Sequence, residues 1–290
     1  MRRYGMAFGS FRELLASSVD VGSLSAAALA REAEESGDSP EQVLERMDAA
    51  LSVMERSIEL GLSGEARSRS GLVGGDAALV ARSAPGLSGD GLSTAVARAL
   101  AVAEVNASMG RIVAAPTGGA SGVLPAVLTT IAERTGAPRE RTVRALVTAA
   151  AIGGVIAARA TLSGAAGGCQ AEIGSAAAMA AGAAVELAGG TPEQVGHAAS
   201  FALQGLLGLV CDPVGGLVEV PCVTRNATGA AVALAAVELA LAGVTFPIPL
   251  DEVIDTMGHV GRSLPPSLRE TARGGLAASP TGRAIGKKTD

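Results

Sequence analysis

Hydrophobic residues recur along this chain at helical spacing in almost every segment. The clearest case is residues 40–61, where apolar side chains follow one another at steps of three and four and form one stripe. Ser39-Pro40 precedes this stripe and Thr191-Pro192 precedes another, and each combines a capping side chain with a proline at the first helical position. These patterns predict a protein built mainly of α-helices.

The same periodicity predicts helices in several other segments, which are separated by turn-forming residues. They are Phe11–Ser18, Leu24–Glu35, Ser93–Ser108, Ser121–Arg134, Arg139–Arg159, Cys169–Ala188, Pro192–Val210, Cys222–Ala242 and Leu250–Arg262. Glycine and serine break the pattern at residues 67–76, which we expect to form a loop. No alternation of apolar and polar residues is long enough to predict a sheet.

The predicted helices between residues 145 and 242 are apolar on nearly all sides and rich in alanine and glycine. Such helices have to be surrounded by other helices, and small side chains let their backbones approach closely. We therefore expect an all-α, multi-helix globular domain with buried Ala/Gly-rich central helices. This single domain would span residues 1–290, with N-terminal helices in residues 1–65 wrapping a core of about residues 90–262.

The apolar content of 48% raises the question of a membrane protein. The longest charge-free run, residues 112–132, contains Pro116, a glycine-rich turn and Pro125, which would break a spanning helix. At the N-terminus, Arg12 and Glu13 come before any hydrophobic region of signal-peptide length. We therefore expect a cytoplasmic protein without a membrane partner.

Residue types that are scarce exclude further classes of function. A pyridoxal-phosphate enzyme needs a lysine in its core, but the two lysines, Lys287 and Lys288, lie in the last four residues. Aromatic residues make up only 2% of the chain, and its net charge is −5 without a basic stripe. Both features argue against a nucleic-acid partner.

The three cysteines are the first candidates for chemistry, and their odd number argues against a disulfide framework. Cys169 and Cys222 begin predicted helices and Cys211 ends one. Unpaired amide groups at a helix N-terminus stabilise a thiolate, which metal binding requires. The Gly/Pro-rich residues 212–221 would turn the chain so that two of the thiols converge.

Several interpretations of these thiols are open. A single cysteine in an Ala-rich interior is most simply a small hydrophobe, but three at predicted helix ends favour a metal site. Structural zinc normally takes four protein ligands and often a CxxC spacing, neither of which is found. Three thiolates without an evident fourth ligand fit an iron–sulfur cluster with one open iron.

A glycine-rich turn precedes one predicted helix. Its residues are Thr117-Gly118-Gly119-Ala120-Ser121. Such a turn can present backbone amides to an anion such as a carboxylate, although on its own it would be a structural turn. It matches neither a P-loop nor a dinucleotide fingerprint.

Other polar residues lie close to the cysteines in the sequence. Arg225, three positions after Cys222, either binds a substrate carboxylate through two hydrogen bonds or pairs with Asp212 or Glu219. The two histidines, His197 and His259, are expected in the core and in solvent respectively. Neither has the sequence context of a catalytic triad.

Three segments together resemble the alpha chain of bacterial iron–sulfur-dependent L-serine dehydratases. They are Met109–Thr117, Gly168–Ser175 and Cys211–Cys222. Residues 70–76 and 269–277 are similar too, so the resemblance runs nearly from end to end. The segment with two cysteines is long enough to be highly specific.

The resemblance implies a [4Fe–4S] cluster held by Cys169, Cys211 and Cys222, and a reaction from L-serine to pyruvate and ammonia. In such an enzyme the open iron acts as a Lewis acid on the serine hydroxyl while a base removes the alpha proton. This chemistry needs no pyridoxal phosphate, in agreement with the missing core lysine.

The chain departs from some relatives of this family. It contains nothing like the beta-type domain of single-chain enzymes, so we expect a separate beta chain as its partner. Certain single-chain relatives end in a cysteine, whereas this sequence ends Lys287-Lys288-Thr289-Asp290.

Substrate contacts are expected from the Thr117–Ser121 turn, Asn226 and Arg225, with Ser108 and Arg111 behind them. The base is not assigned; the candidates are Glu172, Ser108 and a group of the partner chain. Two alternatives remain for the function. One is a related lyase that acts on threonine or cysteine, and the other is a non-catalytic helical subunit whose thiols hold zinc or nothing.

Overall fold

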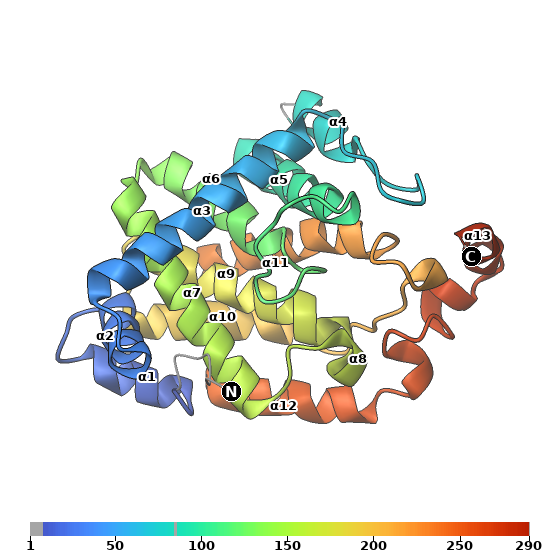
Figure 1. The fold of residues 1–290 in the computed structure, drawn as a ribbon. Helices are drawn as coiled ribbons and strands as arrows, with labels where there is room; N and C mark the ends of the chain where they lie inside the picture. Colours follow the sequence, from blue (N-terminus) through green and yellow to red (C-terminus); the bar gives the residue numbers. More distant parts are fainter. Residues whose placement is uncertain (1–7, 84–85, 290) are drawn as a thin grey trace.

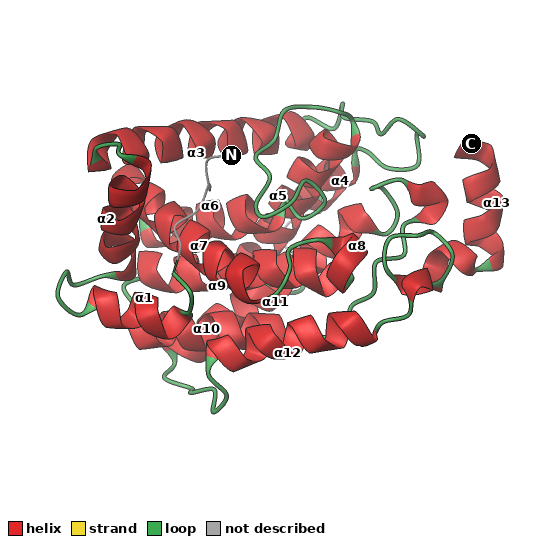
Figure 2. Ribbon diagram, turned by 60° about the horizontal axis from the view of Figure 1, so that its bottom comes forward, coloured by secondary structure: helices red, strands yellow, loops and turns green. Residues whose placement is uncertain are grey.

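The computed structural model describes residues 8–83 and 86–289, and within these ranges it contains helices and no strand. Helices joined by loops make up the described part of both drawings (Figures 1 and 2). This confirms the predicted all-α class.

The helices of the described residues are as follows. They are α1 (Phe11–Ser18), α2 (Leu24–Ser36), α3 (Pro40–Leu62), α4 (Asp76–Arg82), α5 (Asp90–Ala107), α6 (Val123–Thr135), α7 (Arg139–Arg159), α8 (Gly164–Gly167), α9 (Ser175–Leu187), α10 (Pro192–Gln204), α11 (Cys222–Leu241), α12 (Leu250–Ser263) and α13 (Pro280–Thr289). A π-helical turn, η1 (Gln170–Gly174), and three 3₁₀ turns, η2 (Val214–Gly216), η3 (Pro266–Leu268) and η4 (Gly275–Ala278), connect them.

Local signals placed most helix boundaries correctly. The capping residues Ser39 and Thr191 each accept a hydrogen bond from the backbone of a glutamine three residues on, and that glutamine side chain bonds back. Both α1 and α7 begin and end at the predicted residues.

Three predictions about helices need correction. The predicted helix Cys169–Ala188 is divided, because the π-helical turn η1 precedes α9. The predicted helix Pro192–Val210 ends at Gln204, since turns follow it and Gly208 adopts a left-handed conformation with φ +84°. Short helices α4, α8 and α13 lie in segments where no helix was predicted.

Helix α9 forms the centre of the molecule. Every residue in it except Glu186 is buried, and alanines make up most of its surface. It packs against α6, α7, α10 and α11, and runs through the middle of both ribbon views (Figures 1 and 2). The Glu186 carboxylate accepts hydrogen bonds from the backbone and side chain of Ser25 at 3.1 and 2.7 Å, which fastens α2 to this centre.

One helix of the described residues, α7, is long and apolar enough to cross a membrane by length and composition. Other parts of the protein bury 67% of its most apolar window. That burial is typical of a core helix.

Candidate cysteine-lined active site

The three cysteines line one cavity of about 170 Å³. All three side chains are buried, and they come from segments far apart in the sequence. The other residues that line the cavity are Thr117, Gly118, Gly119, Glu172, Pro213, Val218 and Glu270. The structure therefore brings the predicted metal ligands together with part of the predicted glycine-rich turn.

Cys169 is held by the residue that follows it. The Gln170 side chain is buried and donates to the carbonyl oxygens of Gly167 and Met257 at 2.8 and 3.2 Å. Its Oε1 accepts from the amide of Gly208 at 2.9 Å. One glutamine thus joins η1 to α12 and to the turn after α10, and fixes the backbone from which the Cys169 thiol projects.

Cys211 does not end a helix, contrary to the prediction, because α10 stops at Gln204. It lies in extended backbone that pairs with the C-terminal segment. Its amide donates to Leu268 at 2.9 Å, and its carbonyl accepts from the amide of Glu270 at 2.7 Å. The C-terminal segment therefore holds this thiol in place and brings Glu270 to the cavity.

Asp212 fastens the cysteine loop on two sides. Its Oδ2 accepts from the amide of Leu276 at 2.7 Å, and its Oδ1 pairs with Arg225 at 2.8 Å. Gly275 has φ +58°, and a Cβ atom there would collide with the Asp212 carboxylate. Arg225 also donates to the carbonyl of Val210 at 2.9 Å, so it takes the structural role weighed from the sequence.

Glu219 ties the same loop to residues 67–76. Its carboxylate is buried and accepts from both the amide and the hydroxyl of Ser70. A second buried carboxylate, Glu104, accepts three backbone amides, those of Gly75, Asp76 and Ala77, at the start of α4. Burial raises the pKa of Glu104. Residues 67–76 are therefore bonded to the cysteine loop through Ser70 and to α5 through Gly75 and Asp76.

The glycine-rich turn contributes only its first half to the cavity. Thr117, Gly118 and Gly119 line it, whereas Ala120 and Ser121 are fully buried and do not. The Ser121 hydroxyl has no hydrogen-bond partner among the described residues. In this conformation a substrate in the cavity could not reach Ala120 or Ser121, which were predicted to contact it.

Asn226 holds this turn against α11. Its Oδ1 accepts from the amide of Gly122 at 2.9 Å, and its Nδ2 donates to the carbonyls of Gly119 and Cys222 at 2.8 and 3.0 Å. The side chain is only 1% exposed. Asn226 thus positions both the turn and Cys222; its predicted contact with substrate stays a prediction.

We expect Asn226→Ala to lower the free energy of unfolding by about 2–4 kcal/mol, because the buried amide of Gly122 would lose its acceptor. Urea denaturation of the two proteins measures this difference. Thr228→Ala, at an exposed position on the same helix, serves as the control and should change it by less than about 0.5 kcal/mol. A loss below about 1 kcal/mol for Asn226→Ala would contradict the positioning role.

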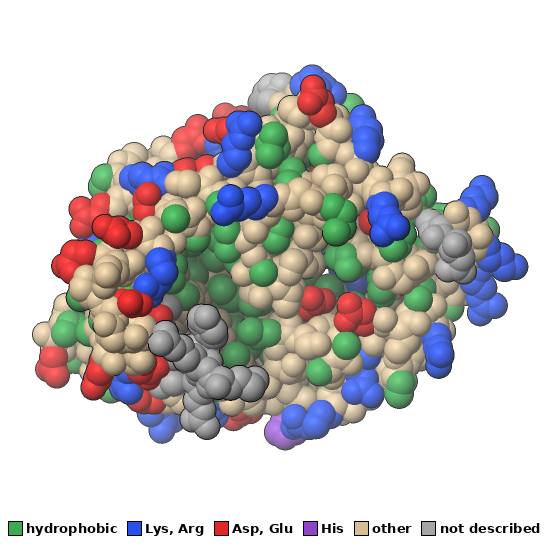
Figure 3. Space-filling view, viewed as in Figure 1, with side chains coloured by type: hydrophobic (Ala, Val, Ile, Leu, Met, Phe, Trp, Pro, Cys, Tyr) green, Lys and Arg blue, Asp and Glu red, His purple; other side chains and the backbone are tan. Residues whose placement is uncertain are grey.

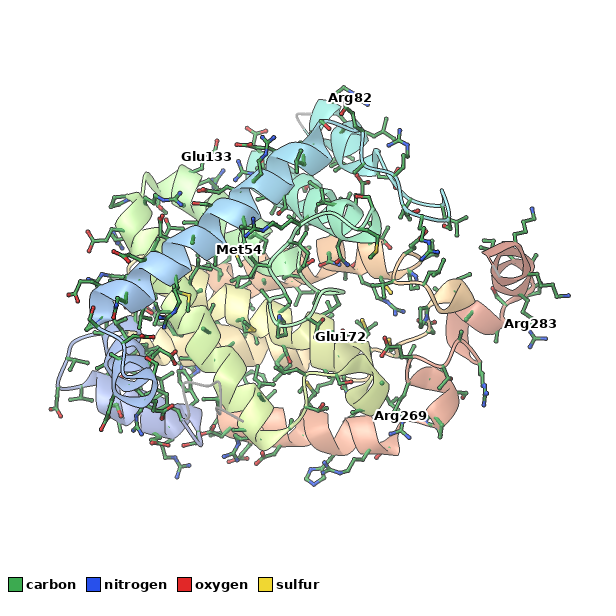
Figure 4. All side chains as sticks on the ribbon, in the orientation of Figure 1. Met54, Arg82, Glu133, Glu172, Arg269 and Arg283 are labelled. Carbon is green, nitrogen blue, oxygen red and sulfur yellow. The ribbon has the colours of Figure 1, made fainter. Side chains whose placement is uncertain are left out.

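Glu172 brings a carboxylate into the cavity beside the thiols (Figure 4). Its Oε1 accepts a hydrogen bond from the Thr117 hydroxyl at 2.7 Å. A Cβ atom at Gly164 would collide with Oε2 of Glu172 and lie 3.1 Å from Sγ of Cys211. Glycine at that position therefore leaves room for the carboxylate next to the thiol. Burial raises the pKa of Glu172, and the hydrogen bond from Thr117 opposes the rise.

Burial also raises the pKa of each thiol, to about 11 for Cys169 and about 12 for Cys222. For Cys211 the pKa is raised by burial and by the other two cysteines, whose negative charge would repel its own. Arg225 partly offsets the rise for Cys169 and Cys222. A group that binds these cysteines as thiolates must therefore bring positive charge and displace their protons.

Among the described residues, no three His, Cys, Asp or Glu side chains meet closely enough to hold one metal ion. A single zinc ion needs every sulfur at about 2.3 Å from one point. A polynuclear cluster spreads its irons and can accept thiolates that are further apart. The donor set of three buried thiols around one cavity fits such a cluster.

Ser108 and Arg111 are not among the residues that line the cavity. The Ser108 hydroxyl donates to the carbonyl of Val105 at 2.9 Å, and Arg111 is exposed. His259 is exposed as predicted. His197 accepts from the amide of Phe246 at 3.2 Å and lines a separate cavity of about 280 Å³ between α1, α10 and α12.

Sequence reasoning missed Glu270, Gly164 and Val218. The backbone of Glu270 is left-handed, with φ +61°, and the residue reaches the cavity only because residues 268–270 pair with Cys211. Its one signal in the sequence was its place in the segment 269–277, which took part in the family resemblance.

Known proteins resemble this chain over most of its length. The family described as "Serine dehydratase alpha chain" matches residues 22–277. The "Probable L-serine dehydratase, alpha chain" of Bacillus subtilis is 52% identical over 263 residues, which cover 90% of this chain and 87% of that one. The "L-serine dehydratase, alpha chain" of Peptoniphilus asaccharolyticus is 46% identical over 260 residues, 89% of each chain. The match to "L-serine dehydratase 1" of Escherichia coli, 47% identical over 182 residues, covers 62% of this chain and 40% of that protein.

Proposed function

This chain belongs to the serine dehydratase alpha-chain family and is the alpha subunit of such a lyase, and we propose that its three cysteines hold a [4Fe–4S] cluster at which L-serine becomes pyruvate and ammonia. The observation that carries the proposal is the convergence of Cys169, Cys211 and Cys222 on one cavity. Three thiolates leave one iron without a protein ligand. When bound, the cluster would supply a Lewis acid for the serine hydroxyl.

The first half of the glycine-rich turn is suited to bind the substrate carboxylate. Gly118 and Gly119 line the cavity, and their amide groups donate to no acceptor among the described residues. Two adjacent free amides can hold a carboxylate by charge-assisted hydrogen bonds. Asn226 accepts from the amide of Gly122 and donates to the carbonyl of Gly119, so the turn is held in this shape before substrate arrives.

Glu172 is suited to accept the alpha proton. Its Oε1 is engaged by Thr117, which orients the carboxylate and leaves Oε2 as the free acceptor toward the thiols. When the proton passes from Cα to Oε2, the electron pair of the C–H bond forms the Cα–Cβ double bond. The Cβ–O bond breaks with its electron pair on oxygen, and the departing hydroxide takes up one proton, which balances the proton that Glu172 has accepted, and leaves as water. The product, 2-aminoacrylate, then tautomerises and hydrolyses to pyruvate and ammonia.

A beta chain would complete the enzyme, since the similar proteins from Bacillus subtilis and Peptoniphilus asaccharolyticus are themselves described as alpha chains. All three cysteines are free thiols, which suits a reducing compartment, and we place the enzyme in the cytoplasm.

We expect serine to exceed threonine in kcat/KM by at least about tenfold, because the extra methyl group must fit between the turn and the thiols. A Cβ atom on Gly119 would lie 3.4 Å from Cγ1 of Val218, so the space beside the turn is narrow. The measurement compares formation of pyruvate from serine, 2-oxobutyrate from threonine and pyruvate with sulfide from cysteine, using the reconstituted two-chain enzyme. A kcat/KM for threonine or cysteine equal to or above that for serine would assign the enzyme to another substrate.

A further inference from the structure

Four exposed apolar side chains lie on loops and turns that line the cysteine cavity or contact the segments that line it. They are Leu72, Met109, Val218 and Leu276, which are 40%, 82%, 39% and 50% exposed. Each belongs to a different loop or turn, and we call the set the rim patch. Large apolar side chains gathered at one place on a surface are typical of a contact with another molecule.

Contacts between the loops bring the members of the rim patch together. Val218 lines the cavity itself, and its neighbour Glu219 bonds to Ser70, two residues before Leu72. On the other side, the amide of Leu276 donates to Asp212, which follows Cys211. Three of the four side chains therefore stand on segments that are tied to the cysteine loop.

Met109 joins the rim patch through the glycine-rich turn. It follows α5 in a left-handed conformation with φ +65°, three residues after Asn106. The Oδ1 atom of Asn106 lies 3.5 Å from the position of a Cβ atom on Gly118, which lines the cavity. The end of α5 thus contacts the turn that lines the cavity.

Positive charge gathers beside the rim patch. The whole chain carries a net charge of −5, yet residues 262–290 hold six Lys or Arg and two Asp or Glu. In the space-filling view, blue side chains stand at the end of the molecule where α13 lies, and red ones gather at the opposite end (Figure 3). Helix α13, which carries three of these cations, packs on η2 within the cysteine loop.

Several of these cations have no partner within the protein. Arg69, Arg111 and Arg273 are exposed and make no hydrogen bond or ion pair with the part of the chain that the structure describes. Arg69 shares the loop of Leu72, Arg111 follows Met109 by two residues, and Arg273 precedes Leu276 by three. An apolar centre with charged groups around it is the usual composition of a protein–protein interface.

We propose that the rim patch and the cations around it form the docking surface for the beta chain, whose matching face carries apolar side chains flanked by carboxylates. This inference rests on the proposed function, which requires a beta chain. Docking there covers the cysteine cavity and separates the serine-binding turn from bulk water. The beta chain thereby closes the active site as well as completing the assembly.

The charge distribution selects this occupant over a second copy of the chain. In a symmetric dimer through the rim patch, the same surface with its excess of cations would face itself. Juxtaposed like charges oppose association, whereas an acidic partner gains affinity and a faster association rate. The surface is therefore suited to a different chain of opposite local charge.

The test measures the dissociation constant of the purified beta chain for anaerobically reconstituted variants of this chain. Leu276→Glu and Leu72→Glu should each weaken binding by at least about tenfold, because they place a negative charge in the apolar centre of an interface whose partner carries carboxylates at its flanks. Arg273→Glu should do the same, and the affinity of the wild type should fall as salt rises.

Two matched controls are available. Leu239→Glu changes an equally exposed leucine, 41%, on α11 about 25 Å along the helix from Cys222. Arg56→Glu changes an exposed arginine on α3. Both should bind the beta chain as the wild type does.

Three results would overturn the proposal. They are equal binding by the rim variants and the controls, absence of beta-chain binding by the wild type, and a wild-type self-dimer that Leu276→Glu dissociates. Binding is read without turnover, and iron is measured in each variant. Loss of iron or of serine activity alone would therefore count against the proposed function and not against the docking surface.

Discussion

Cys211→Ser is expected to lower serine turnover by at least about 10³-fold, because two thiols cannot hold the group that activates the hydroxyl, and a Lewis acid is worth several kcal/mol to such a step. The Cys211 thiol lines the cavity and borders the space beside Gly164 that the Glu172 carboxylate also borders. Pyruvate formation by the reconstituted two-chain enzyme measures the loss. Cys169→Ser and Cys222→Ser should behave alike.

Loss of folding is not the expected cause. The bonds that hold residue 211, from its amide to Leu268 and from Glu270 to its carbonyl, are made by the backbone and persist in the serine variant. The thermal unfolding midpoint of the metal-free proteins should therefore be nearly the same. A Cys211→Ser enzyme with more than a tenth of the wild-type rate would contradict the role of this thiol.

Glu172→Gln is expected to lower kcat by about 10²–10⁴-fold while the iron content stays that of the wild type. Glutamine can still accept the hydrogen bond from Thr117 through its side-chain oxygen, so the geometry is preserved. It cannot take the alpha proton. Steady-state kinetics with serine, together with iron analysis of the same sample, separates a catalytic loss from a loss of the metal group.

The matched control is Glu270→Gln, since Glu270 is the second carboxylate that lines the cavity. Glu270 is exposed, and no side-chain hydrogen bond to its carboxylate is found among the described residues. We expect its replacement to change kcat by less than about tenfold. If Glu270→Gln lowered kcat more than Glu172→Gln, the base that accepts the alpha proton would be Glu270 and not Glu172.

The sequence predicted the helices best where local chemistry decides them. Ser39 and Thr191 carry a complete N-terminal capping pattern within four residues, and both helices start where that pattern placed them. The end of α10 was harder, because an apolar stretch continues through residues 205–210 after the helix has stopped. The turns there are set by packing around Gln170, whose Oε1 accepts the amide of Gly208.

At the candidate site, the cysteines and the glycine-rich turn could be identified from the sequence, but the hydrogen-bond partners of the side chains around them could not. Asn226 was expected to contact substrate, yet its three hydrogen bonds all go to backbone groups of residues 119, 122 and 222. Arg225 pairs with Asp212, which is one of the two roles weighed for it from the sequence. The backbone partners of Asn226 depend on which loops meet in space, and spacing along the chain does not reveal them. Glu270 was missed for the same reason.

The most direct test of the account is elemental analysis of the chain after anaerobic reconstitution with iron and sulfide. We predict about four irons and about four sulfides per chain. In the variant that combines Cys169→Ser, Cys211→Ser and Cys222→Ser, both should be lost. About one zinc per chain without sulfide, or an iron content that the triple variant leaves unchanged, would contradict the assignment of these three cysteines as cluster ligands.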